Sequence, residues 1–514
     1  MKVTVRLTFY DGVGTIGGNK ILLEDLEQAT NVFLDFGTSF GKRGLYFEEY
    51  LKPRSVVGLL DLLEMELLPP LRGIYRDDLV VTPQVWDRVA TSPLGRELSV
   101  NGVLLSHAHV DHSGYISFLR PDIPIFTSTM TALIARAMQD SSPADFEREV
   151  AYLSQRELTG DLLRSGRSAR QRPFIWLDAA SVRQEMWAFW SKNPAKTKSW
   201  DPCPPLVATD RVGGLHVRSW PVDHSIFGAV AYAVETSSGW IVYTGDLRLH
   251  GTQGEFTRQF AEEARALEPK LLLCEGTRAH REERITEEMV LAEALAVAAQ
   301  APGLLIGDFG PRNVERLLTF LEVARATKRR LVVTLKDAYL LEAMHLANPM
   351  VPTVNKTEDM FIYNERKGTV AGWEDELRQR CANRILTASQ VHEDPRGFLL
   401  CLSFFDINEL IDIDPSEGAY IYSSSEAYDE EQVIDMKRLK CWLEHFHLRF
   451  VGEEHGNLHA SGHASGPELL ELARIIEPEM LVPIHTERPD YFASGLEGTG
   501  IRVRVVGQGE SLAF

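Results

Sequence analysis

Short apolar runs that end near histidine or aspartate recur along the chain. Three of these runs are long enough for a buried strand, at residues 103–105, 240–244 and 480–482. A histidine or an aspartate follows each of the three. Residues 215–220 read as a further strand, and residues 1–6 alternate like a first strand. Apolar runs of this length with polar boundaries are typical of strands. The pattern therefore predicts a strand-rich fold with its polar chemistry at strand ends.

Between about residues 281 and 455 the pattern changes. Helix-period runs at 285–301 and 314–326 alternate with apolar runs at 331–335 and 420–422, which predicts parallel βα units. Near residues 140–205 the chain looks helical and interleaves arginines with tryptophans: Arg164, Arg167, Arg170, Arg172, Trp176, Trp187, Trp190 and Trp200. We expect this segment either to contact substrate or to be a solvated helical face that buries its tryptophans.

Composition and charge narrow the class of protein. A chain of 514 residues has the length of about three domains. The N-terminus has no apolar signal segment and no run approaches a membrane span, so we expect a cytoplasmic protein with no membrane partner. The five cysteines lack C-x-x-C spacing, which fits reduced thiols. The net charge of −19 argues against a generic nucleic-acid binder, although metal cations can still make a local site electropositive.

The densest group of ligand-type side chains follows the run at 103–105. His107, His109, Asp111 and His112 fall within six positions. Residues two apart in an extended segment point the same way, so His107 and His109 can face one metal ion while Asp111 and His112, as the chain turns, face a second. The alternative is a polar loop with hydrogen-bonded histidines, but such a loop rarely collects four ligand-type residues after a buried strand. We interpret the run as a dinuclear metal site.

Other strand ends supply further candidate ligands. His224 follows the strand at 215–220, Asp246 closes the run at 240–244, and His485 follows 480–482. In these residues the sequence resembles the metallo-β-lactamase superfamily, whose ligand motifs come in this order and include an early aspartate after a strand, here Asp35. The resemblance implies an α/β fold, an αββα sandwich, built from residues 1–280, with the helical insertion at about 140–205, and from residues 456–514.

The stretch between Asp246 and His485 is long enough to hold an inserted domain. Its flanks carry Glu275, after the apolar run at 271–273, and the sequence Ser461-Gly462-His463. These resemble the acidic and Ser-Gly-His motifs of the β-CASP nucleases, with His485 as the third motif. The resemblance implies a β-CASP domain, a parallel sheet flanked by helices, at residues 281–455.

The glycine-rich run at residues 12–19 narrows the resemblance to the ribonuclease J family. The run also contains the spacing of a dinucleotide-binding fingerprint, but that fingerprint needs a following helix, whereas residues 20–24 continue as a strand. We therefore expect a tight hairpin that borders the metal site. The chain ends soon after His485, so we expect no counterpart of the C-terminal domain of that family.

The resemblance also assigns the metal ligands. One ion would be held by His107, His109 and His224, the second by Asp111, His112 and His485, and Asp246 would bridge them. We expect two divalent ions, zinc or alternatively manganese. Two ions so placed activate a water molecule and neutralise charge on the phosphoryl oxygens.

Catalytic and substrate-binding roles follow in the same way. His463 is the expected general acid and Glu275 its orienting partner, and Asp111 is counted with the catalytic residues as well as with the ligands. The alternatives are that His463 caps a glycine loop and that Glu275 is an ordinary helix N-terminal acid. The expected substrate-binding residues are His459, Ser461, Arg312 and Asn313. The last two lie where a strand passes into a helix, whose first N–H groups favour anions.

Together these features predict a two-metal phosphodiesterase. The resemblance implies a ribonuclease acting on single-stranded RNA as a 5′ exonuclease, an endonuclease or both. His485 favours RNA, since the third motif in β-CASP families is typically His in RNA-processing members and Val in DNA-processing ones. The alternatives are a DNA nuclease or another phosphoester hydrolase on this scaffold, and a catalytically silent RNA-binding subunit. RNA is the expected partner, and a homodimer is the candidate assembly.

Overall fold

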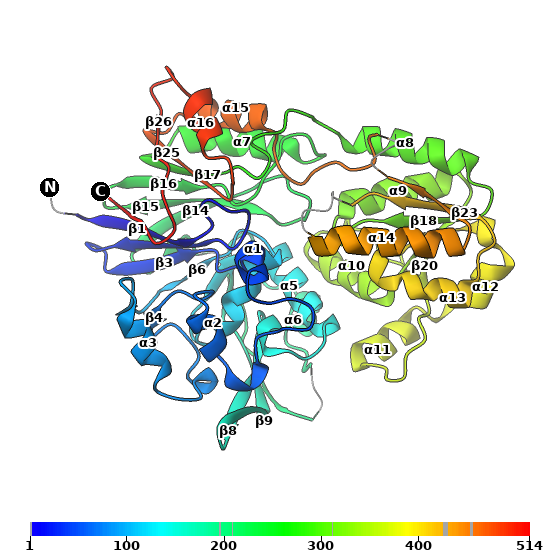
Figure 1. The fold of residues 1–514 in the computed structure, drawn as a ribbon, viewed down its shortest axis with the longest axis horizontal. Coiled ribbons are helices and arrows are strands. Elements are labelled where there is room, and N and C mark those ends of the chain that lie inside the picture. The colour runs from blue at the N-terminus through cyan, green and yellow to red at the C-terminus, as the bar shows by residue number, and fades with distance from the viewer. Residues whose placement is uncertain (1–2, 195–196, 208, 311, 425–429, 453–455) are drawn as a thin grey trace.

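Three large sheets organise the molecule in the computed structural model, which describes residues 3–194, 197–207, 209–310, 312–424, 430–452 and 456–514. Two mixed sheets face each other in one half, and a parallel sheet with helices on both faces forms the other half (Figure 1). The first sheet has the order β12 (Leu206–Val207), β10 (Phe174–Trp176), β7 (Ile125–Thr127), β6 (Gly102–Leu104), β3 (Thr30–Leu34), β2 (Lys20–Asp25), β1 (Val5–Asp11) and β27 (Ser511–Ala513). The second has the order β13 (Arg211–Val212), β14 (Leu215–Pro221), β15 (Val230–Thr236), β16 (Gly239–Tyr243), β17 (Leu271–Glu275), β25 (Met480–Ile484) and β26 (Arg502–Val503).

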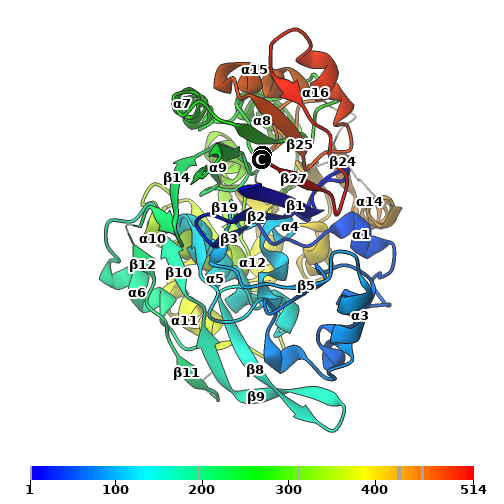
Figure 2. The same ribbon diagram turned by 90° about the vertical axis from the view of Figure 1, so that its left-hand side faces the viewer.

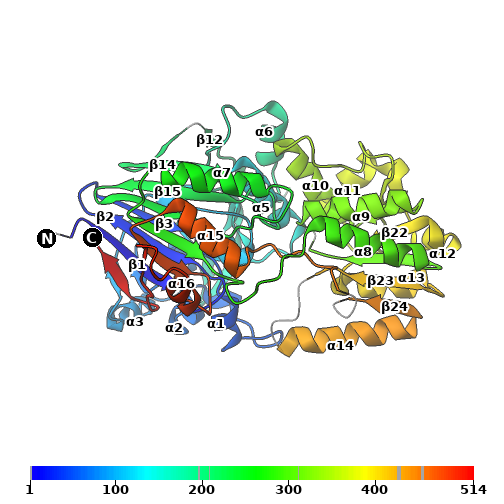
Figure 3. The same ribbon diagram turned by 90° about the horizontal axis from the view of Figure 1, so that it is seen from above.

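The space between these two sheets is an apolar core. Leu7 and Leu104 from the first sheet lie in one buried cluster with Val234, Ile241 and Val482 from the second. Helices α7 (Gly254–Arg265) and α15 (Gly466–Ile476) cover the outer face of the second sheet (Figure 3). Helix α5 (Thr129–Ser141) packs against the first sheet through β10. Each amphipathic helix thus buries its apolar stripe on a sheet, and the expected αββα sandwich is confirmed.

The third sheet is parallel throughout its described pairs. Its order is β21 (Ile385–Leu386), β20 (Met360–Tyr363), β19 (Arg330–Val333), β22 (Phe398–Cys401), β18 (Leu304–Asp308), β23 (Gly418–Tyr422) and β24 (Leu448–Val451). One face is covered by α8 (Glu287–Gln300), α9 (Val314–Ala326), α10 (Leu335–Ala347) and α11 (Gly372–Arg380). The other is covered by α12 (Ala388–Glu393), α13 (Leu410–Ile413) and α14 (Glu430–His445). The predicted parallel βα units are confirmed, and the exact domain boundaries remain predictions.

The insertion near residues 140–205 differs from the expected helical segment. It is mainly a hairpin of β8 (Tyr152–Thr159) and β9 (Leu162–Gln171), with β11 (Ser199–Asp201) beside β9 and one short helix, α6 (Gln184–Trp190). The hairpin extends away from the two facing sheets (Figure 2). Gly160, with φ +62°, begins the two-residue turn that closes it. The helical prediction failed because a bulge between Ser154 and Arg156 breaks the two-residue alternation, so that the buried residues Leu163, Gly166 and Ala169 of β9 are three positions apart.

The tryptophans and arginines of this insertion divide into two groups. Trp176 and Trp190 are fully buried and pack edge to face, and Arg172 is fully buried with its guanidinium on backbone carbonyls. These three residues stabilise the fold. Arg164 and Arg167 are exposed on β9, so a substrate contact there remains a prediction.

Short elements complete the fold. They are α1 (Phe40–Gly44), α2 (Leu60–Glu64), α3 (Val85–Thr91), α4 (Val110–Ser113), α16 (Asp490–Gly495), β4 (Leu71–Arg72) and β5 (Arg96–Glu97). Among the described residues, none of the helices has both the length and the apolar character that crossing a bilayer requires.

Candidate metal centre

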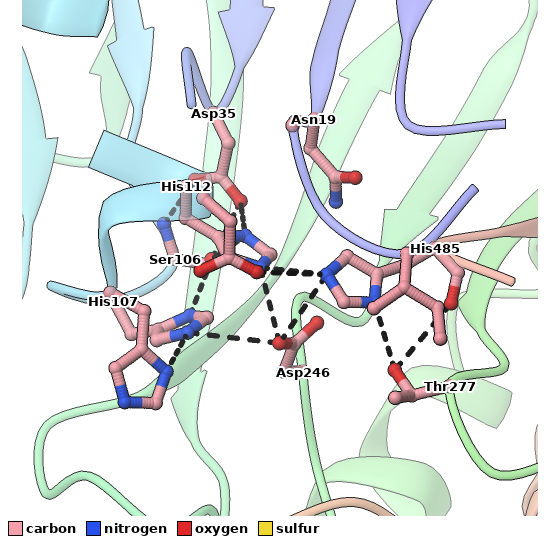
Figure 4. A network of polar contacts seen from close by, with 12 residues as sticks. Asn19, Asp35, Ser106, His107, His112, Asp246, Thr277 and His485 are labelled. Carbon is pink, nitrogen blue, oxygen red and sulfur yellow. Dashed lines mark hydrogen bonds and ion pairs between the residues drawn. The ribbon is translucent and has the colours of Figure 1, made fainter. Parts of the chain in front are cut away.

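The ends of several strands meet at one edge of the sandwich. The second sheet pairs β16, β17 and β25 in parallel, so Asp246, Glu275 and His485 come to the same edge. The segment after β6 brings His107 to His112 from the facing sheet, and His224 follows β14. Figure 4 shows Asp246 between the histidines that follow β6 and His485. All seven residues expected from the sequence as ligands therefore converge.

The nitrogen and oxygen atoms of these residues form two adjoining groups. In the first, His109 Nδ1 lies 3.0 Å from His107 Nε2 and 3.2 Å from His224 Nε2. In the second, His485 Nε2 lies 3.3 Å from both His112 Nε2 and Asp111 Oδ2. Each group gathers several donor atoms within reach of one cation. Imidazole nitrogens and carboxylate oxygens are the ligands that zinc and similar divalent ions bind.

Asp246 faces both groups through one oxygen. Its Oδ2 lies 3.8 Å from His107 Nε2 and 4.0 Å from His224 Nε2 in the first group. It lies 3.1 Å from His112 Nε2 and 3.8 Å from His485 Nε2 in the second. Its Oδ1 is buried and has no hydrogen-bond partner among the described residues. A buried carboxylate with a free oxygen, surrounded by imidazole nitrogens, fits a group that ligates metal.

A second layer of contacts fixes the orientation of the imidazole rings. Asp35 lies 2.6 Å from His112 Nδ1, so the Nε2 atom of that ring faces Asp246. His224 Nδ1 donates to the carbonyl of Gly462 at 2.5 Å, and Thr277 Oγ1 lies 2.8 Å from His485 Nδ1. Holding one ring nitrogen in this way leaves the other available as a ligand. The early aspartate of the sequence motif therefore orients a candidate ligand rather than joining the donor groups.

The glycine-rich run at residues 12–19 packs against this centre, as expected, but it is an eight-residue loop and not the tight hairpin that the sequence predicted. It forms the connection between β1 and β2. Gly18 N donates to the carbonyl of Asp111, and His485 N donates to the carbonyl of Gly12. Gly17 has φ +77°, and a Cβ there would lie 2.9 Å from Asp111 Oδ2. Glycine is needed at this position because both the backbone angle and the space exclude a side chain.

Burial and neighbouring charges set the protonation of the donor groups. Burial, with His112 and His109, holds the pKa of His107 well below its usual range. Burial, with His463, lowers the pKa of His224 to about 4. Burial would also lower the pKa of His112, but the surrounding aspartates raise it well above its usual range. The first group is thus neutral and ready to bind a cation, whereas His112 must release a proton to do so.

A histidine–glutamate pair lies beside the donor groups. His463 Nδ1 is 3.2 Å from Glu275 Oε1, and His463 remains 22% exposed while Glu275 is fully buried. Glu275 also accepts from the backbone N–H groups of Leu247 and Thr277. Burial would lower the pKa of His463, but Glu275 and Asp246 raise it. Glu275 is the last residue of β17, not a helix N-terminal acid, and its contacts hold His463 in place.

The four expected substrate-binding residues lie in two places. His459 Nδ1 donates to the carbonyl of Ser423, and burial with Arg316 lowers the pKa of His459 to about 4. Ser461 Oγ accepts from His463 N and shapes that loop. Burial, which Asp111 partly offsets, lowers the pKa of Arg312. The role of each as a substrate contact stays a prediction.

Arg312 and Asn313 have different local roles. Arg312 Nη1 lies 3.8 Å from Met138 Sδ on α5. The guanidinium of Arg312 therefore lies beside the half of the molecule that contains the two facing sheets. The electrostatic effect of Arg312 also reaches His109. Asn313 is the N-cap of α9, and its Oδ1 accepts from Arg316 N at 3.0 Å. Helix capping alone accounts for an asparagine at this position.

The chain is similar in sequence to several known proteins. Residues 455–506 match a Zn-dependent metallo-hydrolase RNA specificity domain. Ribonuclease J of Sinorhizobium meliloti is 25% identical over 404 residues, which cover 76% of this chain and 58% of that protein. Ribonuclease J of Helicobacter pylori is 20% identical over 494 residues, which cover 95% of this chain and 56% of that protein. The chain thus spans a little over half the length of these two relatives.

Two further matches extend the comparison. Ribonuclease J of Pyrococcus abyssi is 22% identical over 405 residues, 76% of this chain and 75% of that protein. A crystal structure of a protein of unknown function from Enterococcus faecalis is 23% identical, has a TM-score of 0.67, and covers 99% of this chain and 100% of that one. The structural match shows a shared fold. The chain therefore resembles ribonuclease J over most of its length, and its C-terminal part matches a Zn-dependent metallo-hydrolase domain.

Proposed function

We propose that the protein is a two-metal ribonuclease that degrades single-stranded RNA. The observation that carries the proposal is the convergence of six ligand-type side chains around the carboxylate of Asp246, next to the His463–Glu275 pair. Similarity to ribonuclease J over most of the chain supports RNA as the substrate. The match at residues 455–506 to an RNA specificity domain supports it further.

The residues present fit two divalent ions. His107, His109 and His224 would hold one, Asp111, His112 and His485 the other, and Asp246 would contact both. The ions would supply an activated water and neutralise charge on the phosphoryl oxygens. Zinc suits a set rich in imidazole, and manganese is the alternative. The number and identity of the ions are part of the proposal.

The side chains beside the ligands perform the remaining steps. Glu275 accepts a hydrogen bond from Nδ1 of protonated His463, so Nε2 is the atom that donates a proton to the leaving 3′ oxygen. Arg312 supplies a positive charge that can hold a substrate phosphate, and His459 and Ser461 lie on the same loop as His463. Cleavage of this kind leaves products with a 5′-monophosphate. A cytoplasmic location and a homodimer remain expectations from the sequence.

An assay with purified protein tests the proposal. RNA and DNA of the same sequence, labelled at the 5′ or the 3′ end, are incubated with Zn²⁺ or Mn²⁺, and product lengths are read with time. We expect faster loss of RNA, beginning at an end. Equal or faster cleavage of DNA would overturn the ribonuclease assignment but leave the metal chemistry intact. Absence of cleavage with either metal would favour the silent RNA-binding alternative.

A further inference from the structure

A fully buried arginine joins three separate parts of the molecule. Arg248 Nε donates to Asp223, the residue before His224, at 3.1 Å. Its Nη1 donates to the carbonyl of Ser461 at 3.0 Å, and its Nη2 pairs with Glu315. Asp223 belongs to the sandwich, Ser461 to the loop that carries His463, and Glu315 to the first turn of α9 in the inserted half.

A second buried arginine holds the same loop from the other side. Arg316, on α9, pairs with Glu287 of α8 through Nε at 2.9 Å and Nη2 at 3.0 Å. The guanidinium also donates to the carbonyls of Leu458 and Ala460, each at 3.3 Å. Arg316 is fully buried, so these contacts are shielded from solvent. Both arginines therefore connect adjacent residues of α9 to one loop.

Four carbonyl groups of the loop at residues 458–463 accept hydrogen bonds from other parts of the chain. Leu458, Ala460 and Ser461 accept from the two arginines, and the carbonyl of Gly462 accepts from His224 Nδ1 at 2.5 Å. His463 follows directly. The backbone that places His463 thus depends on α9 on one side and on the metal-ligand motif on the other.

We propose that Arg248 and Arg316 are positioning residues through which the inserted half sets the place of His463 relative to the donor groups. Arg248 differs from Arg316 in that it contacts Asp223 of the ligand motif as well as the His463 loop and, through Glu315, helix α9. A planar guanidinium spreads its five donors over three nitrogen atoms and can reach three separate acceptors, whereas the three donors of an ammonium group share one nitrogen. The inference rests on the proposed function, since it assigns His463 the role of proton donor.

A comparison of two substrates tests this role. The first is RNA, whose leaving 3′ oxygen needs a proton, and the second is a p-nitrophenyl phosphodiester, whose leaving group departs without one. We expect Arg248→Lys to lower kcat on RNA about 10- to 100-fold with KM and metal content near wild type. Activity on the nitrophenyl ester should change little. Glu315→Gln keeps the size of the side chain and is expected to act in the same direction.

Arg76 provides a matched control. It is also fully buried and donates to the carboxylates of Asp78 and Glu149 and to the carbonyls of Ser117 and Ser154, and none of these acceptors belongs to the His463 loop. Arg76→Lys should cost similar stability and leave both activities unchanged. A His463→Ala, Arg248→Lys double variant should be no slower on RNA than His463→Ala alone, because the effect acts through His463.

The outcomes separate the inference from the proposed function. Equal losses on the two substrates, loss of metal, or an equal effect of Arg76→Lys would overturn the positioning role while wild-type cleavage of RNA stands. Additive losses in the double variant would also overturn it. A wild-type protein that cleaves neither substrate with Zn²⁺ or Mn²⁺ would remove the proposed function and this inference with it.

Discussion

The substitution Asp35→Asn tests whether Asp35 orients a metal-binding histidine or is itself a ligand. Asp35 is fully buried, and its Oδ2 accepts from Ser106 Oγ at 2.7 Å and Tyr243 at 2.5 Å and contacts His112 Nδ1 at 2.6 Å. Its Oδ1 accepts from Ser106 N at 2.7 Å. An amide has one oxygen, so one of these donors would face an NH₂ group. The charge that favours His112 in its present orientation would also be lost.

The expected magnitude follows from these contacts. Loss of an outer partner of a metal-binding histidine lowers metal affinity about 10- to 100-fold, which is about 1.4 to 2.8 kcal/mol. One buried donor without an acceptor costs about 1 to 3 kcal/mol of folding stability. We therefore expect weaker binding of the ion that His112, His485 and Asp111 are proposed to hold, with the other proposed ion retained. Competition with a coloured chelator measures the affinity, and denaturant unfolding measures the stability.

Asp25→Asn is the matched control for this experiment. Asp25 is also fully buried, and it accepts from Ser237 N at 2.7 Å and Ser237 Oγ at 3.0 Å at the far end of β2. The control should lose comparable stability and keep both ions. If Asp35→Asn binds both ions as tightly as the wild type, or loses both, the argument from ring orientation is wrong.

Three further predictions concern the site. His463→Ala should lower turnover by about two to four orders of magnitude with metal content intact. Glu275→Gln should act in the same direction but more weakly. Loss of metal from the His463→Ala variant would make His463 a ligand. Arg312→Ala should raise KM for RNA more than it lowers kcat. In a salt titration it should reduce the slope of log affinity for RNA against log salt concentration by about 1, and an unchanged slope would exclude a phosphate contact. Metal binding should release a proton because the pKa of His112 is raised in the folded chain, so the affinity for metal should rise with pH. Calorimetry in buffers of different ionisation enthalpy measures the proton release. A binding enthalpy that does not depend on the buffer would contradict this prediction.

Local patterns in the sequence predicted which residues converge, because each candidate ligand lies in a segment that follows a strand. His107 and His109 are two positions apart, and His107 Nε2 and His109 Nδ1 lie 3.0 Å from each other in the same group. Helix and strand periods likewise predicted the parallel units of the inserted half. These features depend on neighbours in sequence, so a linear pattern contains them.

Contacts between distant segments were not predictable in the same way. The roles of Arg248 and Arg316 depend on acceptors more than a hundred positions away, and nothing in their local sequence marks them. The hairpin at β8 and β9 was missed because its alternation is interrupted by a bulge between Ser154 and Arg156. The orienting role of Asp35 likewise needs the distance to His112, which only the fold provides.

The metal content of wild-type protein and of Asp246→Ala tests the central claim most directly. Asp246 Oδ2 lies within 4.0 Å of the Nε2 atoms of His107, His112, His224 and His485, so its loss should disturb both ions. Elemental analysis after gentle purification should give about two divalent ions per wild-type chain. It should give markedly fewer for Asp246→Ala, which should be less active than any variant of a single histidine ligand. A wild-type content near zero with no metal-dependent activity would contradict the account, as would an Asp246→Ala protein that keeps both ions and its turnover.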